Sequence, residues 1–429
     1  MIEPVDFLKE LFRVAVDRAL AQTHLASFLP APPKGRTVVV GAGKASAAMA
    51  LALEASWPRH AELSGLVVTR YGHVPSANSM QTSRIEIMQA SHPVPDEMSV
   101  LAASKMLKKV QCLSDQDLVI ALISGGGSSL MTLPCEGLTL QEKQKINQAL
   151  LNCGASIDQI NCVRKHLSQV KGGRLAMAAF PAKVITICIS DVPGDDPQTI
   201  ASGPTLADTS SCSDALAVID QFGIEIPQVV RDRLQSAELE TPKTILNVSG
   251  TDVRIMASAS DSLRAAASWA KAQGIEPYIL GDDFQGESSS VASFHASLAK
   301  SVFRGLGGFS RPCVLLSGGE TTVTLGGTTK GKGQGGRSSE FCLSLTQALQ
   351  GCENVWALSA DTDGIDGVSE SAGAIVTPTT LARASALGLD IKDHLARHDS
   401  FDFFNRLGDL VTTGPTFTNV NDFRALLIL

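Results

Sequence analysis

The stretch VITICISDVPGDDPQTIASGPT, Val184–Thr205, decides the fold. It begins with an apolar run, residues 184–190, that lacks the polar alternation of a strand with one solvated face. This run predicts a strand covered on both faces, as in parallel α/β sheets. It ends in a loop that contains three carboxylates, three prolines and two glycines. Because ligands bind beyond the carboxyl ends of parallel strands, this loop is a candidate functional site.

Nine further short apolar runs predict strands. They cover residues 37–40, 65–69, 85–89, 117–124, 244–249, 277–280, 313–317, 355–359 and 373–376. Helical patterns such as 96–110 and 258–273 lie between them, and Thr139 with Glu142 forms a capping box that begins another helix. The alternation predicts βαβ repeats, and hence an α/β fold with parallel sheets.

The length of 429 residues predicts two or three domains. We expect an amino-terminal domain over residues 1–240 and a carboxy-terminal domain over residues 241–429. The boundary lies where a polar stretch, Gln235–Lys243, precedes a fresh strand. No low-complexity linker marks it, so the chain can pass between the domains more than once.

Composition and charge narrow the class of function. A net charge of −7 argues against nucleic acid or an acidic membrane as a partner. Charged residues interrupt the apolar positions of the N-terminal segment, which excludes a secretory signal and favours a packed helix. The apolar face of that helix comprises Leu8, Phe12, Ala15 and Ala19. Nine cysteines without a C-x-x-C motif indicate reduced thiols in a cytoplasmic protein.

The first predicted strand leads into a glycine-rich turn with Gly41, Gly43 and Lys44 at a helix start. Free backbone N–H groups and the helix dipole favour an anion there, and the lysine adds a positive charge. The turn is not a Walker A loop, and Ser46 and Arg70 replace the third glycine and the acidic residue of a dinucleotide fingerprint. A tight turn with a solvated lysine is the structural alternative.

Two other glycine-rich segments predict ligand cradles. The loop after the fourth strand could hold a phosphate or a polyol, or could be a sharp turn into a helix. It comprises Ser124, Gly125, Gly126, Gly127, Ser128 and Ser129. The basic segment 325–341 could close over a polyphosphate, with the planar guanidinium of Arg337 on phosphoryl oxygens, or could be a hairpin tip. Its candidate cofactor contacts are Lys332, Gly335 and Gly336, together with Gly318 and Gly319 of an earlier turn.

Two acidic loops follow strands. The first contains Asp191, Asp195 and Asp196, and the second contains Asp361, Asp363 and Asp366. Carboxylates at strand ends suit hard cations or general-base chemistry. The second loop does not meet the spacing of a calcium loop, so Mg²⁺ held partly by substrate phosphates fits better. Asx-turn hydrogen bonding is the alternative for both loops.

Anion cradles, isolated cations and acidic clusters at strand ends are what phosphoryl transfer requires. The candidate cations include Arg164, and His92 follows another strand, although a lone histidine is more often structural. A nicotinamide-dependent hydroxypyruvate reductase is an alternative that the incomplete fingerprint argues against. A non-enzymatic sugar-phosphate or nucleotide sensor is a second alternative, which would not explain the metal-suited acids.

The ordered motifs resemble the glycerate 2-kinases of the MOFRL type, a group also labelled tartrate-utilisation hydroxypyruvate reductases. The matching stretches extend from about residue 37 to residue 422. They are VVGAGKAS, SHPVPDE, LISGGGSSL, INCVRKHLSQVKGGRLA, ISDVPGDDPQTIASGPT, LSGGETTVTL, GKGQGGRSSEF, SADTDGIDG, AGAIV and GPTFTNVND. Any one of them is weak, but the ordered set is specific.

The resemblance implies an α/β/α Rossmann-like amino-terminal domain, a carboxy-terminal MOFRL domain and an active site in the cleft between them. It implies ATP, Mg²⁺ and D-glycerate, with 2-phosphoglycerate and ADP as products, and a homodimer is compatible with it. The chain departs from the family at Ser338 and Ser339, where the family has G-G-R-N-Q-E, and at Thr377, where an acid is common. The first departure lies beside Arg337 and bears on nucleotide or acceptor preference.

Each candidate residue then has an expected role. Catalysis would use Lys44, Asp191 and Arg337, with Asp191 orienting or deprotonating the C2 hydroxyl. Residues 124–128 and Arg164 would bind the substrate. The nucleotide would contact Gly41, Gly43, Gly318, Gly319, Lys332, Gly335 and Gly336, and Asp195, Asp361 and Asp363 would bind the metal.

Overall fold

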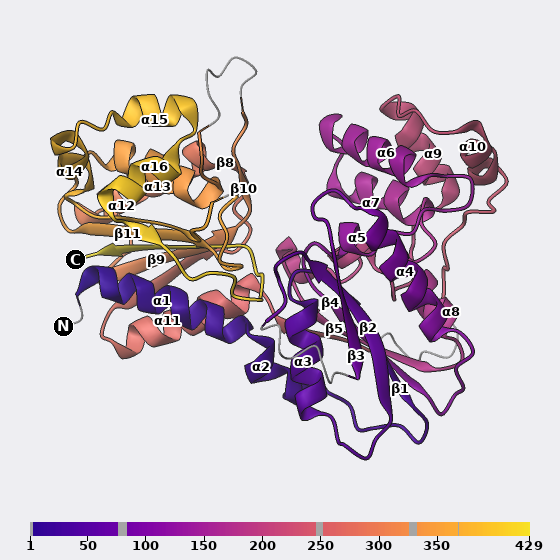
Figure 1. Ribbon diagram of the computed structural model, residues 1–429. Helices are drawn as coiled ribbons and strands as arrows, with labels where there is room; N and C mark the ends of the chain where they lie inside the picture. Colours follow the sequence, from indigo (N-terminus) through magenta and orange to yellow (C-terminus); the bar gives the residue numbers. More distant parts are fainter. Residues whose placement is uncertain (1–2, 76–83, 246–251, 326–332, 368) are drawn as a thin grey trace. The chain divides into compact units, whose positions relative to one another are not determined.

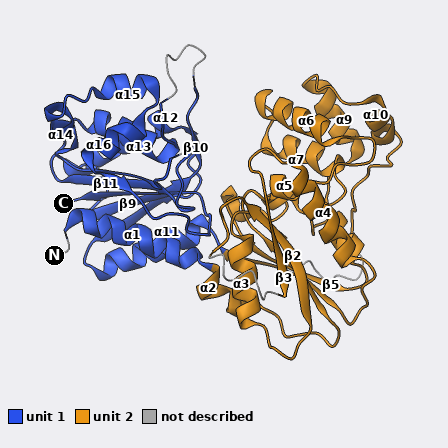
Figure 2. Ribbon diagram, in the orientation of Figure 1, with its two compact units in different colours: residues 1–20, 257–429 blue, residues 21–256 orange. Residues whose placement is uncertain are grey.

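The computed structural model describes all residues except 1–2, 76–83, 246–251, 326–332 and 368. The chain forms two compact units (Figure 2). Unit 1 contains residues 1–20 and 257–429, and unit 2 contains residues 21–256. No helix among the described residues is long and apolar enough to cross a membrane.

Unit 2 is built on a six-stranded sheet in the order β3-β2-β1-β4-β5-β6. The neighbouring pairs among the first five strands are parallel, as predicted. The strands are β1 (Thr37–Ala42), β2 (Leu63–Arg70), β3 (Ile85–Ala90), β4 (Leu118–Ile123), β5 (Lys183–Ile189) and β6 (Asp252–Ala257). The predicted strand 244–249 lies largely outside the described residues.

The sheet of unit 2 has its topological switch point between β1 and β4. Connections from β1 run toward β2 and β3, whereas β4 continues to β5 on the other side. Ala42 at the end of β1 is in register with Ile123 at the end of β4. The turns that follow these two strands therefore lie side by side, at the position where open α/β sheets bind ligands.

Helices of unit 2 fall into two groups (Figure 1). Those beside the sheet are α2 (Ala21–His24), α3 (Ser46–Ser56), α4 (Glu97–Val110), α5 (Gly127–Leu130) and α8 (Arg174–Ala179). A separate helical group with its own apolar core comprises α6 (Leu140–Asn152), α7 (Ile157–His166), α9 (Cys212–Gln221) and α10 (Gln228–Gln235). The predicted capping box is present, because Glu142 N–H donates to Thr139 Oγ1 and the Glu142 carboxylate accepts from Thr139 N–H. Short 3₁₀ turns cover Leu25–Phe28, Pro193–Asp195 and Ile200–Ser202.

Unit 1 contains a second six-stranded sheet in the order β13-β12-β11-β14-β9-β7. Its strands are β7 (Glu276–Gly281), β9 (Cys313–Gly319), β11 (Val355–Asp361), β12 (Gly373–Val376), β13 (Leu410–Val411) and β14 (Asp422–Ile428), and β8 (Gly286–Glu287) pairs with β10 (Thr321–Thr322). The prediction of parallel sheets was wrong here, because β14 enters antiparallel between β11 and β9. The apolar run of β14 was not predicted as a strand.

Helices cover both faces of the unit 1 sheet (Figure 1). One face carries α1 (Pro4–Ala19) and α11 (Ala259–Ala272), and residues of these helices share a core with Leu316 and Leu358. The other face carries α12 (Ser288–Phe303), α13 (Arg337–Leu349), α14 (Thr380–Ala386), α15 (Ile391–Arg397) and α16 (Ser400–Leu407). Leu315 belongs to this second core, whereas its neighbours Val314 and Leu316 belong to the first. Successive side chains of a strand point to opposite faces, so this alternation is expected.

The two units differ from the expected ranges 1–240 and 241–429 at two places. Residues 241–256 belong to unit 2, and helix α1 belongs to unit 1. Leu8 and Phe12 of α1 are buried in the unit 1 core, which confirms the predicted apolar face. This burial explains why α1 belongs to unit 1, although the residues that follow it in the sequence belong to unit 2. The chain consequently passes between the units twice.

Candidate functional site

The carboxyl edge of the unit 2 sheet brings together three turns that the sequence singled out. Lys44 follows β1, Ser124 follows β4 and Asp191 follows β5. The amide of Lys44 donates to the Gly125 carbonyl at 2.8 Å, which joins the first two turns directly. The parallel pairing of β4 with β5 brings the Asp191 turn next to them.

Two glycines make the close approach of these turns possible. A Cβ at Gly41 would lie 2.3 Å from the Leu122 carbonyl oxygen of β4. A Cβ at Gly43, whose φ is +141°, would lie 2.1 Å from Ser124 Oγ. That hydroxyl accepts a 3.0 Å hydrogen bond from the Ala45 amide at the start of α3. Gly41 and Gly43 therefore act here by letting the backbones meet.

The glycine-rich loop offers backbone donors to an anion. Within the described part of the chain, the amides of Gly125 and Gly126 have no hydrogen-bond partner, and Gly125 is buried. Lys44 lies beside them, since a Cβ at Gly126 would lie 3.5 Å from Lys44 Cγ. Unpaired amides next to a cation suit a phosphate or carboxylate group.

His92 borders this loop, and His73 follows the end of β2. A Cβ at Gly126 would lie 2.8 Å from His92 Nε2, so the imidazole contacts the loop. Burial, with the charges of Lys44 and Arg70, lowers the pKa of His92 to about 3. Burial and the Arg70 charge likewise lower the pKa of His73 to about 4, and neither of its ring nitrogens has a hydrogen-bond partner among the described residues. Both rings are neutral near pH 7.

Ser128 takes part in a chain of three polar side chains. Its Oγ lies 3.0 Å from Ser202 Oγ, which in turn donates to Asn161 Oδ1 at 3.0 Å. The backbone of this loop is held from below by Lys171, whose buried ammonium group donates to the carbonyls of Ser128 and Met131 at 2.7 and 2.8 Å. Burial lowers the pKa of Lys171 well below its ordinary value.

The turn that carries Ser202 has an unusual backbone. Ala201, Ser202 and Gly203 all have φ between 52° and 60°, the left-handed region. For residues other than glycine, this conformation costs about 1–2 kcal/mol each. The turn is joined to the segment after Lys171, because the Gly172 amide donates to the Ser202 carbonyl.

The three acids of the 191–196 loop do not share one role. Asp196 accepts hydrogen bonds from the Gln198 amide and from the Thr199 hydroxyl, so it caps its own turn. Asp195 has a φ of 56° in the 3₁₀ turn, and Asp191 is half-buried at the end of β5. The Asx-turn alternative therefore holds for Asp196, and Asp191 is the acid that is next to the sheet edge.

Arg164 lies on α7, one turn after Asn161. Its pKa is lowered by burial, and its Nε has no hydrogen-bond partner among the described residues. A largely buried guanidinium nitrogen that lacks a partner can accept an anionic ligand. The structure thus keeps Arg164 as a candidate for carboxylate binding.

In unit 1, Arg337 is the first residue of α13 and lies among three carboxylates. Its Nε donates to Asp422 Oδ1 at 2.7 Å and its Nη2 to Asp361 Oδ2 at 2.8 Å. Its Nη1 donates to Glu320. The charges of these acids outweigh burial and raise the pKa of Arg337 well above its ordinary value. We expected this guanidinium to bind phosphoryl oxygens, and in this structure its fork is occupied by protein carboxylates.

Asp366 occupies the N-terminus of the same helix. Its carboxylate accepts hydrogen bonds from the amides of Ser338 and Ser339 at 2.9 and 2.8 Å, and from the Ser339 hydroxyl at 2.6 Å. Burial is the largest influence on this carboxyl group and raises its pKa to about 7. Ser338 and Ser339, which depart from the family pattern, are thus the residues that hold Asp366.

The other two acids of this loop form successive Asx turns. The Asp363 amide donates to Asp361 Oδ1 at 3.0 Å, and the Ile365 amide donates to Asp363 Oδ1 at 2.9 Å. Both carboxylates are almost fully buried. Their oxygens are the hard donors that Mg²⁺ prefers, but Arg337 holds Asp361 Oδ2, so a magnesium ion would have to displace the guanidinium from that oxygen. Asp195 belongs to unit 2, and the three predicted metal ligands do not form one set within either unit.

The predicted glycines Gly319, Gly335 and Gly336 lie too close to other atoms to carry a side chain, whereas Gly318 makes an ordinary contact. A Cβ at Gly319 would lie 2.3 Å from the backbone of Phe284, and one at Gly318 would meet Asp282 at 3.4 Å. A Cβ at Gly336 would lie 2.2 Å from Asp366 Oδ1, and one at Gly335 would lie 2.2 Å from the Ser400 hydroxyl. Gly335 and Gly336 therefore allow the chain to reach α13 past these side chains. Lys332 lies outside the described residues.

Several residues of both groups were not among the predicted ones. In unit 1 they are Glu320 and Asp422, and in unit 2 they are His73 and Ser202. Asp422 ends the motif GPTFTNVND, and its position before an apolar run was a signal that could have been used. His73 follows β2 without any motif, so nothing in the sequence marks it.

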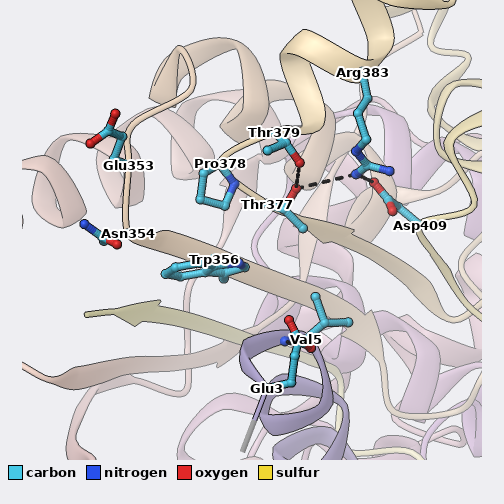
Figure 3. A pocket seen from close by; sticks show the side chains of 10 residues that line it. All are labelled: Glu3, Val5, Glu353, Asn354, Trp356, Thr377, Pro378, Thr379, Arg383 and Asp409. Atoms are coloured by element: carbon cyan, nitrogen blue, oxygen red, sulfur yellow. Dashed lines mark hydrogen bonds and ion pairs between the residues drawn. The ribbon is translucent and has the colours of Figure 1, made fainter.

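Unit 1 also contains a hollow of about 570 Å³ that none of the predicted site residues lines (Figure 3). It lies at the start of β11, around Trp356, whereas Asp361 is at the other end of that strand. Figure 3 shows Thr377 beside Thr379 and Arg383, with Asp409 next to the guanidinium. Thr377, the third departure from the family pattern, therefore lies near the start of β11, whereas Arg337 binds Asp361 at the end of that strand.

Comparison with known proteins gives one family match in the first half of the chain and another in the second half. Residues 7–235 match a family described as a domain of unknown function, DUF4147, and residues 313–422 match the MOFRL family. A protein of Agrobacterium vitis named "Putative hydroxypyruvate reductase" is 52% identical over 98% of this chain and 94% of its own length. A D-glycerate 2-kinase of Thermotoga maritima is 40% identical over 98% of this chain and 96% of its own length.

Solved structures agree with the sequence relatives. The crystal structure of a glycerate kinase from Thermotoga maritima matches with a TM-score of 0.87 and 38% identity, over 99% of both chains. The two matched families together account for most of the chain, and the motifs that carried the resemblance lie at the strand ends described above. The chain belongs to the MOFRL-type glycerate 2-kinase family.

Proposed function

We propose that this protein transfers the terminal phosphoryl group of ATP to the 2-hydroxyl of D-glycerate, which gives 2-phosphoglycerate and ADP. The observation that carries the proposal is the cradle after β1 and β4, where Lys44 adjoins the unpaired amides of Gly125 and Gly126. Relatives named glycerate kinase over nearly the full chain support it. Phosphoryl transfer depends on positioning and charge stabilisation, which these groups supply.

The residues of unit 2 provide an anion site and a base. Gly125 and Gly126 donate backbone hydrogen bonds to an anionic group, and the Lys44 ammonium balances its charge. Arg164 is proposed to bind the glycerate carboxylate. Asp191 is proposed to accept the proton of the attacking hydroxyl, or to orient it, as a carboxylate in hydrogen-bond reach can do.

The residues of unit 1 provide the acids and the second cation. Asp361 and Asp363 would hold Mg²⁺, with Asp195 as a further candidate, and the ion would neutralise charge on the phosphates of ATP. Arg337 is proposed to stabilise charge on the transferred group once a ligand competes with Asp361 and Glu320 for its fork. Gly318, Gly319, Gly335, Gly336 and Lys332 remain candidates for nucleotide contacts, as do Gly41 and Gly43 of unit 2.

The direct test is to identify the product. The protein is incubated with ATP, Mg²⁺ and D-glycerate, and the mixture is followed by proton-coupled ³¹P NMR. A phosphate ester at C2 has one neighbouring proton and gives a doublet, whereas an ester at C3 has two and gives a triplet. Appearance of the triplet alone would reject the position that we propose but keep the kinase, and absence of ADP would reject both.

The reductase is a second candidate, because a relative at 52% identity carries that name. Arg70 ends β2 where a dinucleotide-binding sheet has an acid that binds the ribose, so the geometry does not favour NADH. Arginine there could still bind the 2′-phosphate of NADPH. The matched assay follows NADPH absorbance with hydroxypyruvate, and turnover in that assay without ADP formation in the first would favour the reductase.

A further inference from the structure

The Ser128–Ser202–Asn161 chain has a defined direction. Ser202 has one hydroxyl proton, and it donates that proton to Asn161 Oδ1. The two serine oxygens are 3.0 Å apart, and because the Ser202 proton is used toward Asn161, the hydrogen bond between the serines uses the Ser128 proton. Ser128 is half-buried, and its oxygen is left with lone pairs alone to offer to a ligand. It is therefore set as a hydrogen-bond acceptor.

The left-handed turn holds this arrangement in place. Ser202 is 1% exposed and Asn161 is 5% exposed, so water does not compete for their hydrogen bonds. A Cβ at Gly127 would lie 2.9 Å from the Ala201 Cβ, so the methyl group of Ala201 packs on the backbone of the loop. Left-handed backbone at two non-glycine residues in a row persists only where the surroundings stabilise it, and such strain collects at functional sites.

We infer that the turn Ala201–Gly203 fixes Ser128 as the acceptor for a hydroxyl group of the phosphoryl-acceptor substrate. Anionic groups would be repelled by the Ser128 lone pairs, so the ligand group here is an alcohol, and the neighbouring amides take the anion. Ala201 and Ser202 are positioning residues, because they act through Ser128. The inference rests on the proposed function, in which the substrate is a hydroxy acid.

Two variants separate this role from ordinary packing. Ala201→Gly removes the methyl contact and the strain, and Ser202→Ala keeps the backbone but removes the hydroxyl that accepts from Ser128. For each, we expect KM for D-glycerate to rise about threefold to tenfold, the value of one neutral hydrogen bond, while KM for ATP is unchanged. A residue that only supports folding would not change one KM and spare the other.

Ala237→Gly is the matched control. Ala237 also has a left-handed backbone, with φ of 58°, but it is exposed and follows α10, away from the Ser128 chain. Its replacement should leave both KM values unchanged, and thermal unfolding of all three variants confirms that they are folded. The inference is wrong if Ala201→Gly and Ser202→Ala both keep the wild-type KM for glycerate, or if KM for ATP rises in parallel.

Assays of the wild-type protein distinguish a failure of the proposed function from a failure of this inference. A wild-type protein that forms no ADP with D-glycerate contradicts the proposed function, and the inference falls with it. A wild-type protein that is active, with unchanged variants, contradicts the inference alone.

Discussion

Arg337 Nε and Asp422 Oδ1 are 2.7 Å apart, although 85 residues separate them in the sequence. Asp422 is fully buried and also accepts from Arg424 at 2.6 Å, so one carboxylate joins two guanidinium groups. The contact ties the first residue of α13 to the first residue of β14. The Arg337 guanidinium, which we propose for catalysis, therefore also stabilises the fold of unit 1.

Replacement of Arg337 should consequently affect both stability and turnover. In the Arg337→Ala variant, Asp361 and Asp422 lose a buried counter-charge, and we expect the free energy of unfolding to fall by about 3–5 kcal/mol. Arg337→Lys keeps the charge and should be more stable, but the loss of the planar fork should still lower kcat about a hundredfold or more. Urea unfolding and steady-state kinetics of the folded fraction measure the two effects.

The control for Arg337 is Arg264→Ala. Arg264 is 63% exposed and pairs with Asp261 on the surface of α11. Its removal should change the free energy of unfolding by no more than about 0.5 kcal/mol and leave kcat as it is. An Arg337→Lys variant with normal kcat would remove the arginine fork from the proposed mechanism.

Gly43→Ala tests the junction between the first two turns. The new methyl group would lie 2.1 Å from Ser124 Oγ, and the φ of +141° is unfavourable for alanine, so the turns must move apart. We expect a loss of about 1–3 kcal/mol in stability and a loss of activity. Gly72→Ala is the control, because Gly72 also has a positive φ but has no described atom within 4 Å of the new methyl group. It should cost only about 1 kcal/mol and keep activity; equal effects of the two variants would contradict the steric argument.

Lys171→Met tests the support of the glycine-rich loop. The carbonyls of Ser128 and Met131 would lose their buried donor, which costs about 1–3 kcal/mol of stability, and the loop should become less well ordered. Lys143→Met is a matched variant, since Lys143 is equally buried and donates to the carbonyls of Arg164 and Leu167 at the end of α7. Hydrogen exchange should increase at Gly125–Ser129 in the Lys171 variant. The same increase in the Lys143 variant would show that the effect is global.

The imidazoles of His73 and His92 should remain neutral between about pH 5 and 8. Burial holds their folded-state pKa values at about 4 and 3, below the ordinary value of 6.5. Their contribution to stability is therefore present above pH 6.5 and is lost as the pH falls toward 4 and 3. NMR titration of the ring Cε1–H resonances checks this, with the urea-unfolded chain as the reference. A ring that titrates near pH 6.5 in the folded protein would contradict the burial that the structure shows.

The part of the fold that local patterns control was predicted well. Strand β12 begins and ends as expected at residues 373–376, and α4 begins directly after the Asp96 cap. The apolar run of β14 was a local signal that was not used, but its antiparallel place between β9 and β11 depends on pairing with segments far away in the chain. No residue-level pattern predicts a left-handed alanine, since alanine avoids that region unless tertiary contacts impose it.

Local patterns also selected the candidate site residues. Strand-end motifs predict Lys44, Ser124–Ser128 and Arg337 as site residues, because ligands bind beyond strand ends, and their roles stay predictions. The partners of Arg337 were not identified: Asp361 was expected to bind a metal and in the structure accepts from the guanidinium. Which carboxylate pairs with which guanidinium group depends on the register of the sheet strands, and a single sequence does not reveal that register.

Asp366 should make stability depend on pH with an unusual sign. Burial raises its pKa to about 7, above its ordinary value of 3.8, so the folded state retains a proton between these values that the unfolded state has lost. The stabilising contribution is complete below pH 3.8 and is lost as the pH rises through 7. Asp366→Asn does not titrate, so the difference in free energy of unfolding between wild type and variant should change across pH 4–7 and then level off. Urea unfolding at several pH values measures it, and Asp363→Asn serves for comparison within the same loop. A difference that stays constant from pH 4 to 8 would mean that the three hydrogen bonds to Asp366, and not its burial, set its protonation state.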